Sequence, residues 1–242
     1  MGRVRIFAGP NGSGKTTVNE ELKGQFNLGY YLNADDLCLK VEKDDRIDLS
    51  CFNLSPSFAE LESFFCDHNL YQTLPFGISF KLVDSCLVFS KQTNMYEIAI
   101  LADYLRHSLL KTKATFSFET VFSHPDKVSF IEKANKQGYR TYLYFVSTNS
   151  PEINIARVKA RVSLGGHDVP ESKILKRYKR SLDNLLPAMK LAYRTYMFDN
   201  SGKQAKLIAQ VTPAKNMHVE AKQLPIWFEE YVLSRLSDQT NS

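Results

Sequence analysis

The residues best suited to chemistry form one loop near the start of the chain, Gly9-Pro10-Asn11-Gly12-Ser13-Gly14-Lys15-Thr16-Thr17, which contains a full G-x-x-x-x-G-K-[ST] match. Its glycines allow backbone N–H groups to converge on phosphate oxygens, and a helix that begins there adds positive partial charge. Lys15 is expected to reach the β- and γ-phosphates, and the Thr16 hydroxyl to ligate Mg²⁺. The loop therefore predicts binding of a nucleoside triphosphate with Mg²⁺.

The loop does not name the reaction, because kinases, GTPases and motor ATPases share it. The N-K-x-D and D-x-x-G patterns of a switch GTPase are missing from the sequence, and no apolar strand ends in the Asp-Glu pair typical of motor ATPases. These observations favour a small-molecule kinase.

Two aspartates follow a short predicted strand, Tyr30–Asn33. A carboxylate after the second strand, close to the phosphate loop, can accept the proton of an acceptor hydroxyl. We expect Asp35 to be this base, with Asp36 the weaker candidate and a substrate contact. The alternative is that the pair caps the next helix.

A third acid, Glu119, ends the alternating strand Thr115–Glu119. The carboxyl ends of strands in an open parallel sheet are where ligands bind. Glu119 is expected to bind acceptor hydroxyls or a Mg²⁺-bound water, and Thr120 and Ser123 to add hydrogen bonds. For Ser123, capping of the next helix is an equal alternative.

The excess positive charge of the chain is concentrated between Arg157 and Arg180. The whole chain carries a formal charge of +5, whereas this segment holds eight Lys or Arg and two acids, a local charge of +6. Arg157 and Arg161 share a helix face, and a Gly-Gly linker follows. Arg177 lies on the next helix and is expected to contact the substrate. Arginines on a hinged pair of helices are typical of a lid that closes on polyphosphate, so we expect a lid at 157–180; the alternative is a solvated basic face.

The composition excludes several other classes. With 43% hydrophobic and 24% charged residues, a chain of 242 residues can bury a core and is not globally disordered. No apolar run is long enough to span a bilayer, and the N-terminus lacks a signal-peptide core, so a cytoplasmic protein is expected. The four cysteines show no zinc-ligand spacing, and the net charge is too small to predict nucleic-acid binding.

Apolar runs alternating with helical patterns predict an α/β fold with a parallel sheet covered on both faces by helices. The other predicted strands are 4–8, 140–146, 195–199 and 206–210, and the predicted helices are 16–25, 96–111, 126–137, 151–164, 170–192 and 225–236. Residues 38–112 interrupt the alternation and predict a mostly helical, substrate-side insertion within a single domain, 1–242.

Taken in order, these motifs resemble the zeta toxin family of P-loop kinases, in its chromosomal, stand-alone branch. The resemblance rests on Ala8–Thr17, Asn33–Asp36, Phe118–Thr120, Arg157–Pro170, Arg177–Leu182 and Phe198–Ser201, and it covers roughly residues 3–210. It implies a kinase-type P-loop domain that uses ATP or GTP.

The resemblance also implies an acceptor, the 3′-hydroxyl of UDP-N-acetylglucosamine, with Asp35 as base, Glu119 against the sugar, and Arg161 with Arg157 or Arg177 as lid arginines. An antitoxin, where one exists, would be a separate chain. Because 38–112 does not match the toxin closely, another sugar, antibiotic or metabolite stays open as acceptor. So does a nucleotide-dependent binding or regulatory protein without catalysis.

Overall fold

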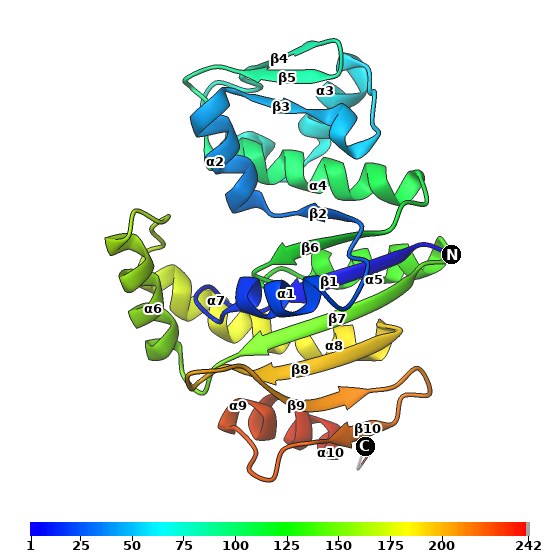
Figure 1. The fold of residues 1–242 in the computed structure, drawn as a ribbon, viewed down its shortest axis with the longest axis vertical. Coiled ribbons are helices and arrows are strands. Elements are labelled where there is room, and N and C mark those ends of the chain that lie inside the picture. Colours follow the sequence, from blue (N-terminus) through cyan, green and yellow to red (C-terminus); the bar gives the residue numbers. More distant parts are fainter. Residues whose placement is uncertain (241–242) are drawn as a thin grey trace. The chain divides into compact units, whose positions relative to one another are not determined.

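The computed structural model describes residues 1–240, and their contacts divide the chain into two compact units, Met1–Leu28 with Ser117–Ser242, and Gly29–Phe116. The division does not test the predicted single domain, 1–242, which stays a prediction. Figure 1 labels the elements along the chain.

The first unit is built on a sheet in the order β10-β9-β8-β7-β1-β6. Its strands are β1 (Arg3–Ala8), β6 (Phe116–Thr120), β7 (Arg140–Ser147), β8 (Arg194–Asp199), β9 (Lys206–Val211) and β10 (Met217–Val219). β7 pairs in parallel with β1 and β8, as predicted, but β9 and β10 are antiparallel. Periodicity predicts that a strand forms, not its direction, because direction depends on the connection between strands.

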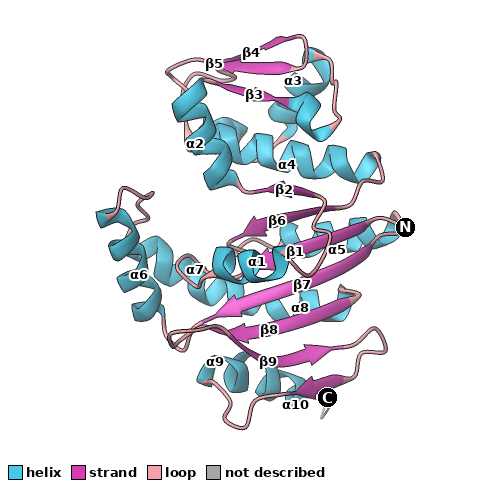
Figure 2. Cartoon of the chain, in the orientation of Figure 1, coloured by secondary structure: helices cyan, strands magenta, loops and turns pink. Residues whose placement is uncertain are grey.

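The sheet forms because its strands carry apolar side chains on both faces. The consecutive residues Ile6 and Phe7 in β1 are both fully buried, as are Phe145 and Val146 in β7, as expected for strands covered on both sides. Figure 2 shows α1 (Lys15–Lys23) in front of the sheet and α5 (Asp126–Lys136) and α8 (Leu185–Leu191) behind it. The mixed α/β architecture with a mostly parallel sheet confirms the predicted fold class.

The long helix predicted over 170–192 is interrupted. The structure has α7 (Glu171–Asp183) and α8 in its place, with Asn184 between them. Pro187 has no N–H to donate to the carbonyl of Asp183, so an uninterrupted helix would lose that hydrogen bond. The Asn184 amide instead donates to the Phe122 carbonyl at 2.9 Å.

The remaining helices of this unit lie close to their predicted positions. They are α6 (Pro151–Ser163), α9 (Ile226–Phe228) and α10 (Ser234–Thr240), the last two joined by a π-helical turn, Glu229–Leu233. Trp227 is buried against Phe145, and its Nε1–H donates to Asp199 Oδ1 at 2.9 Å. This contact fixes the C-terminal segment to the end of β8.

The second unit, 29–116, contains a small sheet that was not predicted. β3 (Arg46–Asp48), β5 (Cys86–Phe89) and β4 (Phe80–Val83) pair antiparallel in that order, in addition to β2 (Tyr30–Leu32). Its helices are α2 (Ala34–Asp44), α3 (Phe58–Asp67) and α4 (Met95–Lys111), with short 3₁₀ turns at Leu49–Phe52 and Tyr71–Thr73. Strands of three or four residues are too short to show a clear alternation.

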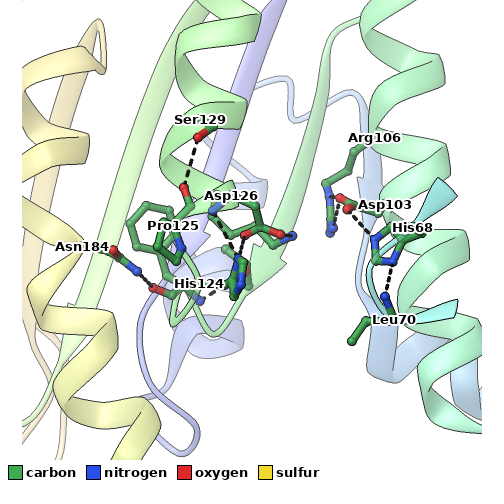
Figure 3. A network of polar contacts seen from close by, with 12 residues as sticks. His68, Leu70, Asp103, Arg106, His124, Pro125, Asp126, Ser129 and Asn184 are labelled. Carbon is green, nitrogen blue, oxygen red and sulfur yellow. Dashed lines mark hydrogen bonds and ion pairs between the residues drawn. The ribbon is translucent and has the colours of Figure 1, made fainter. Parts of the chain in front are cut away.

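Polar networks tie helix ends within each unit (Figure 3). In the second unit, Asp103 accepts from the buried Arg106 and bonds His68 Nε2 at 3.1 Å, while the Leu70 N–H donates to His68 Nδ1. In the first unit, the His124 ring contacts Asp126 at the start of α5. That helix has Pro125 as its N-cap, so Ser123 does not cap it.

Candidate active site

The predicted phosphate loop lies between the end of β1 and the start of α1, where the pattern requires it. At two positions of the loop, the backbone angle and the neighbouring atoms leave room only for glycine. Gly9 has φ +144° and Gly14 has φ +91°, which residues with a Cβ rarely adopt. A Cβ on Gly9 would lie 2.0 Å from the Val146 carbonyl oxygen, and one on Gly14 would lie 2.1 Å from Asn200 Nδ2. The loop therefore packs too closely against β7 and β8 to carry side chains at these positions.

The loop carbonyls are held by hydrogen bonds. Asn154 Nδ2 donates to the Asn11 carbonyl at 2.5 Å, and Asn200 Nδ2 donates to the Ser13 carbonyl at 2.8 Å. Lys15 Nζ donates to the Pro10 carbonyl at 3.1 Å. The ammonium group of Lys15 is thus kept against the loop that it is predicted to serve.

The first turn of α1 joins the end of β6 through a hydroxyl and a carboxylate. Thr16 Oγ1 donates to Glu119 Oε2 at 2.9 Å. Two residues predicted separately, one for Mg²⁺ and one at the acceptor or a metal-bound water, are therefore direct neighbours. The adjacent Thr120 is engaged locally, because its Oγ1 accepts from the N–H of Phe122 at 3.1 Å.

The basic segment forms two helices joined by a short linker, as predicted. Arg157 Nη2 on α6 donates to the Gly202 carbonyl at 3.0 Å, and Arg161 Nη2 donates to the His167 carbonyl of the linker at 2.7 Å. From α7, Arg177 Nη1 donates to Asn11 Oδ1 at 3.3 Å. Of these arginines, Arg177 contacts a residue of the phosphate loop.

A pocket of about 250 Å³ lies beside the start of α1. Its lining comes from the loop and α1, from α6, and from the segment after β8: Gly14, Thr17, Glu21, Arg157, Asn200, Lys203, Gln204 and Ala205. The Nη1 atom of Arg157 is buried and has no hydrogen-bond partner among the described residues. The pocket therefore offers a cationic, hydrogen-bonding wall directly next to the phosphate loop.

Asp35 and Asp36 belong to the second unit, in the first turn of α2. Both side chains are exposed. Asn33 is the N-cap of this helix, and its side chain accepts from the N–H of Asp35 at 3.0 Å. Neither aspartate is the N-cap residue, but both lie in the first turn of α2, where a carboxylate stabilises the N-terminus of a helix.

Sequence reasoning missed Asn154 and gave Asn200 no role beyond its place in the Phe198–Ser201 stretch of the resemblance. Asn154 is fully buried, and the hydroxyl of Thr148 donates to its Oδ1. Asn154 lies 143 residues from its partner in the loop. An amide that bonds a distant backbone carbonyl leaves no spacing that a sequence pattern could detect.

The family comparison agrees with the motifs. The zeta toxin family model matches residues 90–208, which include Glu119 and the basic segment, whereas the phosphate loop precedes the match. A Haemophilus influenzae protein, described as uncharacterized, is 34% identical over 74 residues. That alignment covers 31% of this chain and 53% of the relative, so the comparison spans about half of the relative's length.

Two solved structures share the fold. A chain of the AvrRxo1-ORF1:-ORF2 structure with ATP aligns with TM-score 0.56 and 14% identity, over 100% of this chain and 64% of its own length. A chain of the PezAT chromosomal toxin–antitoxin system of Streptococcus pneumoniae aligns with TM-score 0.50 and 12% identity, over 100% of this chain and 88% of its own length.

The mostly parallel sheet, with the loop between β1 and α1, gives this chain the P-loop α/β fold that the sequence predicted. The family match confirms, more narrowly, the resemblance to the zeta toxin family of P-loop kinases that the motifs indicated. Over residues 1–240, no helix combines the length and apolar character needed to cross a membrane.

Proposed function

We propose that this chain is a nucleotide-dependent kinase that transfers the γ-phosphate of ATP or GTP to a hydroxyl group. The observation that carries the proposal is the phosphate loop, whose glycines have the backbone angles and close contacts of a phosphate cradle at the start of α1. The match to the zeta toxin family and the ATP in the AvrRxo1 structure support a nucleotide as donor.

Residues of the first unit are the proposed contacts of the nucleotide that donates the phosphate. Lys15 and the start of α1 place positive charge at the phosphates. The pocket beside Thr17 is the proposed binding site of the purine base of the nucleotide. Arg157, Arg161 and Arg177 are the lid arginines of the proposal, which would offset charge on the transferring phosphoryl group.

The adjacent oxygens of Thr16 and Glu119 fit a magnesium ion. Mg²⁺ prefers oxygen ligands and commonly takes one or two from the protein, the others coming from water and phosphate. The Thr16 hydroxyl at the start of α1 and the Glu119 carboxylate at the end of β6, 2.9 Å apart, supply such a pair. When bound, the ion would neutralise charge on the phosphate oxygens.

For the acceptor side, the proposal assigns Asp35 as the general base, with Asp36, Glu119 and Thr120 as substrate contacts. Asp35 is exposed in the first turn of α2, so its carboxylate is accessible to an acceptor hydroxyl. UDP-N-acetylglucosamine is the leading acceptor, and its support is the family resemblance. The PezAT structure belongs to a toxin–antitoxin system, which supports a separate antitoxin chain as a possible partner to test.

The test is to incubate the protein with Mg²⁺-ATP and UDP-N-acetylglucosamine and to search by mass spectrometry for a singly phosphorylated nucleotide sugar. Asp35→Asn should lower the rate by about 10² to 10⁴, the usual contribution of a general base, and should leave ATP binding intact. Asp44→Asn is the matched control, because Asp44 is exposed at the far end of the same helix.

Each outcome separates the alternatives. A product that disappears in Asp35→Asn and persists in Asp44→Asn supports the kinase, its acceptor and its base together. ATP binding without this product refutes the acceptor and calls for a screen of metabolite extracts. Binding without any phosphorylated product in that screen would refute catalysis and favour a regulatory nucleotide-binding protein.

A further inference from the structure

We infer that Asn154 and Asn200 are positioning residues that orient the phosphate-binding N–H groups of the loop before any nucleotide arrives. The inference rests on the proposed function, because it deepens the account of the same site. Its evidence is the pair of amide-to-carbonyl hydrogen bonds from α6 and from the end of β8 to the loop.

The geometry follows from the planar trans peptide, in which the C=O and the next N–H point in opposite directions. Asn200 holds the Ser13 carbonyl, so the N–H of Gly14 is directed away from Asn200. Asn154 holds the Asn11 carbonyl, which directs the N–H of Gly12 in the same manner. Both amides therefore turn loop carbonyls outward and leave N–H groups for an anion.

Both asparagines are fixed by their surroundings. Asn154 is fully buried and Asn200 is 7% exposed, so little solvent competes for their amide groups. The Thr148 hydroxyl donates to Asn154 Oδ1, which leaves the Asn154 NH₂ group directed at the loop. A hydrogen bond that already exists in the free protein lowers the ordering cost of binding.

The close contacts explain why the loop must have glycines where it does. A Cβ on Gly14 would meet Asn200 Nδ2, and a Cβ on Gly12 would lie 2.6 Å from the Asn154 carbonyl oxygen. The two asparagines and the two glycines thus form one packed unit. The sequence motif of the loop contains the two glycines but neither asparagine.

The test measures the affinity of Mg²⁺-tripolyphosphate and Mg²⁺-ATP by calorimetry in Asn154→Ala and Asn200→Ala. Tripolyphosphate has no base, so it reports on the loop rather than on the neighbouring pocket. We expect each variant to bind both ligands about tenfold more weakly, the loss typical of one hydrogen bond. Asn135→Ala is the matched control, since Asn135 Nδ2 donates at 2.8 Å to the Leu191 carbonyl at the end of α8. Its affinities should stay within about twofold of wild type.

A structural role alone would lower stability in all three variants and leave tripolyphosphate affinity unchanged, which would overturn the inference. Weaker ATP binding with unchanged tripolyphosphate binding would also overturn it and assign Asn200 to the base. If the wild-type protein bound neither ligand, the proposed function would fail as well.

A second measurement does not depend on the variants folding. Titration of the ¹⁵N-labelled wild-type protein with Mg²⁺-tripolyphosphate should shift the amide protons of Gly12 and Gly14 downfield, as expected for N–H groups that donate to phosphate. Unshifted signals from both glycines would refute the inference.

Discussion

Replacing Gly9 with alanine tests how closely the phosphate loop packs on the sheet. Gly9 has φ +144°, and its N–H donates to the Thr120 carbonyl at 3.3 Å. An added Cβ would lie 2.0 Å from the Val146 carbonyl oxygen and 3.0 Å from Ser13 Oγ. The first of these neighbours is backbone of a central strand, so it cannot move aside as the end of a flexible side chain could.

The magnitude has two parts. A φ of +144° lies beyond the left-handed helical region, in a range that essentially only glycine adopts, and it costs about 1–3 kcal/mol for a residue with a Cβ. Forcing extra volume into a packed site costs about 1–3 kcal/mol more. Gly9→Ala should therefore lower the free energy of unfolding by about 2–6 kcal/mol, the sum of these two effects.

Two other glycines separate the two parts. Gly138 has φ +82° with nothing within 4 Å of an added Cβ, so Gly138→Ala carries the backbone cost alone, about 1–2 kcal/mol. Gly24 has an ordinary helical φ and open space, and Gly24→Ala should raise stability by about 0.4–1 kcal/mol. Urea unfolding at 25 °C measures all three. If Gly9→Ala cost no more than Gly138→Ala, the close approach of the loop to β7 would be refuted.

The remaining predictions concern stability. Burial raises the pKa of Glu97, whose carboxylate accepts from the Ser79 N–H at 2.6 Å. The pKa of Glu97 is higher in the folded protein than in the unfolded chain. The contribution of this group to the free energy of unfolding is therefore fully present below about pH 4.3, and it is lost as the pH rises through the folded pKa. Glu97→Gln should flatten that part of a plot of unfolding free energy against pH, and an unchanged slope would contradict the assignment. Asn19 is fully buried on α1, and neither atom of its amide has a partner among the described residues. Asn19→Leu should therefore raise the free energy of unfolding by about 1–2 kcal/mol, which a higher urea midpoint would show. A lower midpoint would show that the Asn19 amide makes hydrogen bonds in the folded protein.

Local pattern predicted the elements of the donor site because each lies within a short stretch of chain. β1, the loop and α1 occupy residues 3–23, so strand, glycines and helix start could be recognised together. The apolar runs of β7 and β8 and the two helices that carry Arg157 and Arg177 were predicted for the same reason. Conformation within about twenty residues depends mostly on local sterics and on burial pattern.

Contacts between distant parts of the chain were not predictable in this way. The hydrogen bond from the Asn184 amide to the Phe122 carbonyl, beside the break between α7 and α8, and the pairing of β3 with β5 both join residues that are far apart in the chain. The antiparallel direction of β9 follows instead from its short connection to β8, which the apolar pattern of the strand does not record. Tertiary packing overrides local preference at such places.

The phosphate loop shows the division most clearly. The sequence by itself determined that a loop of this composition follows a strand, opens a helix and is suited to bind phosphate. Only the tertiary structure decided which side chains hold it, because Asn154 and Asn200 reach it from 143 and 187 residues away. A hydrogen bond to a backbone carbonyl places no demand on the residue that owns the carbonyl, so such a partner leaves no trace in the loop's own sequence.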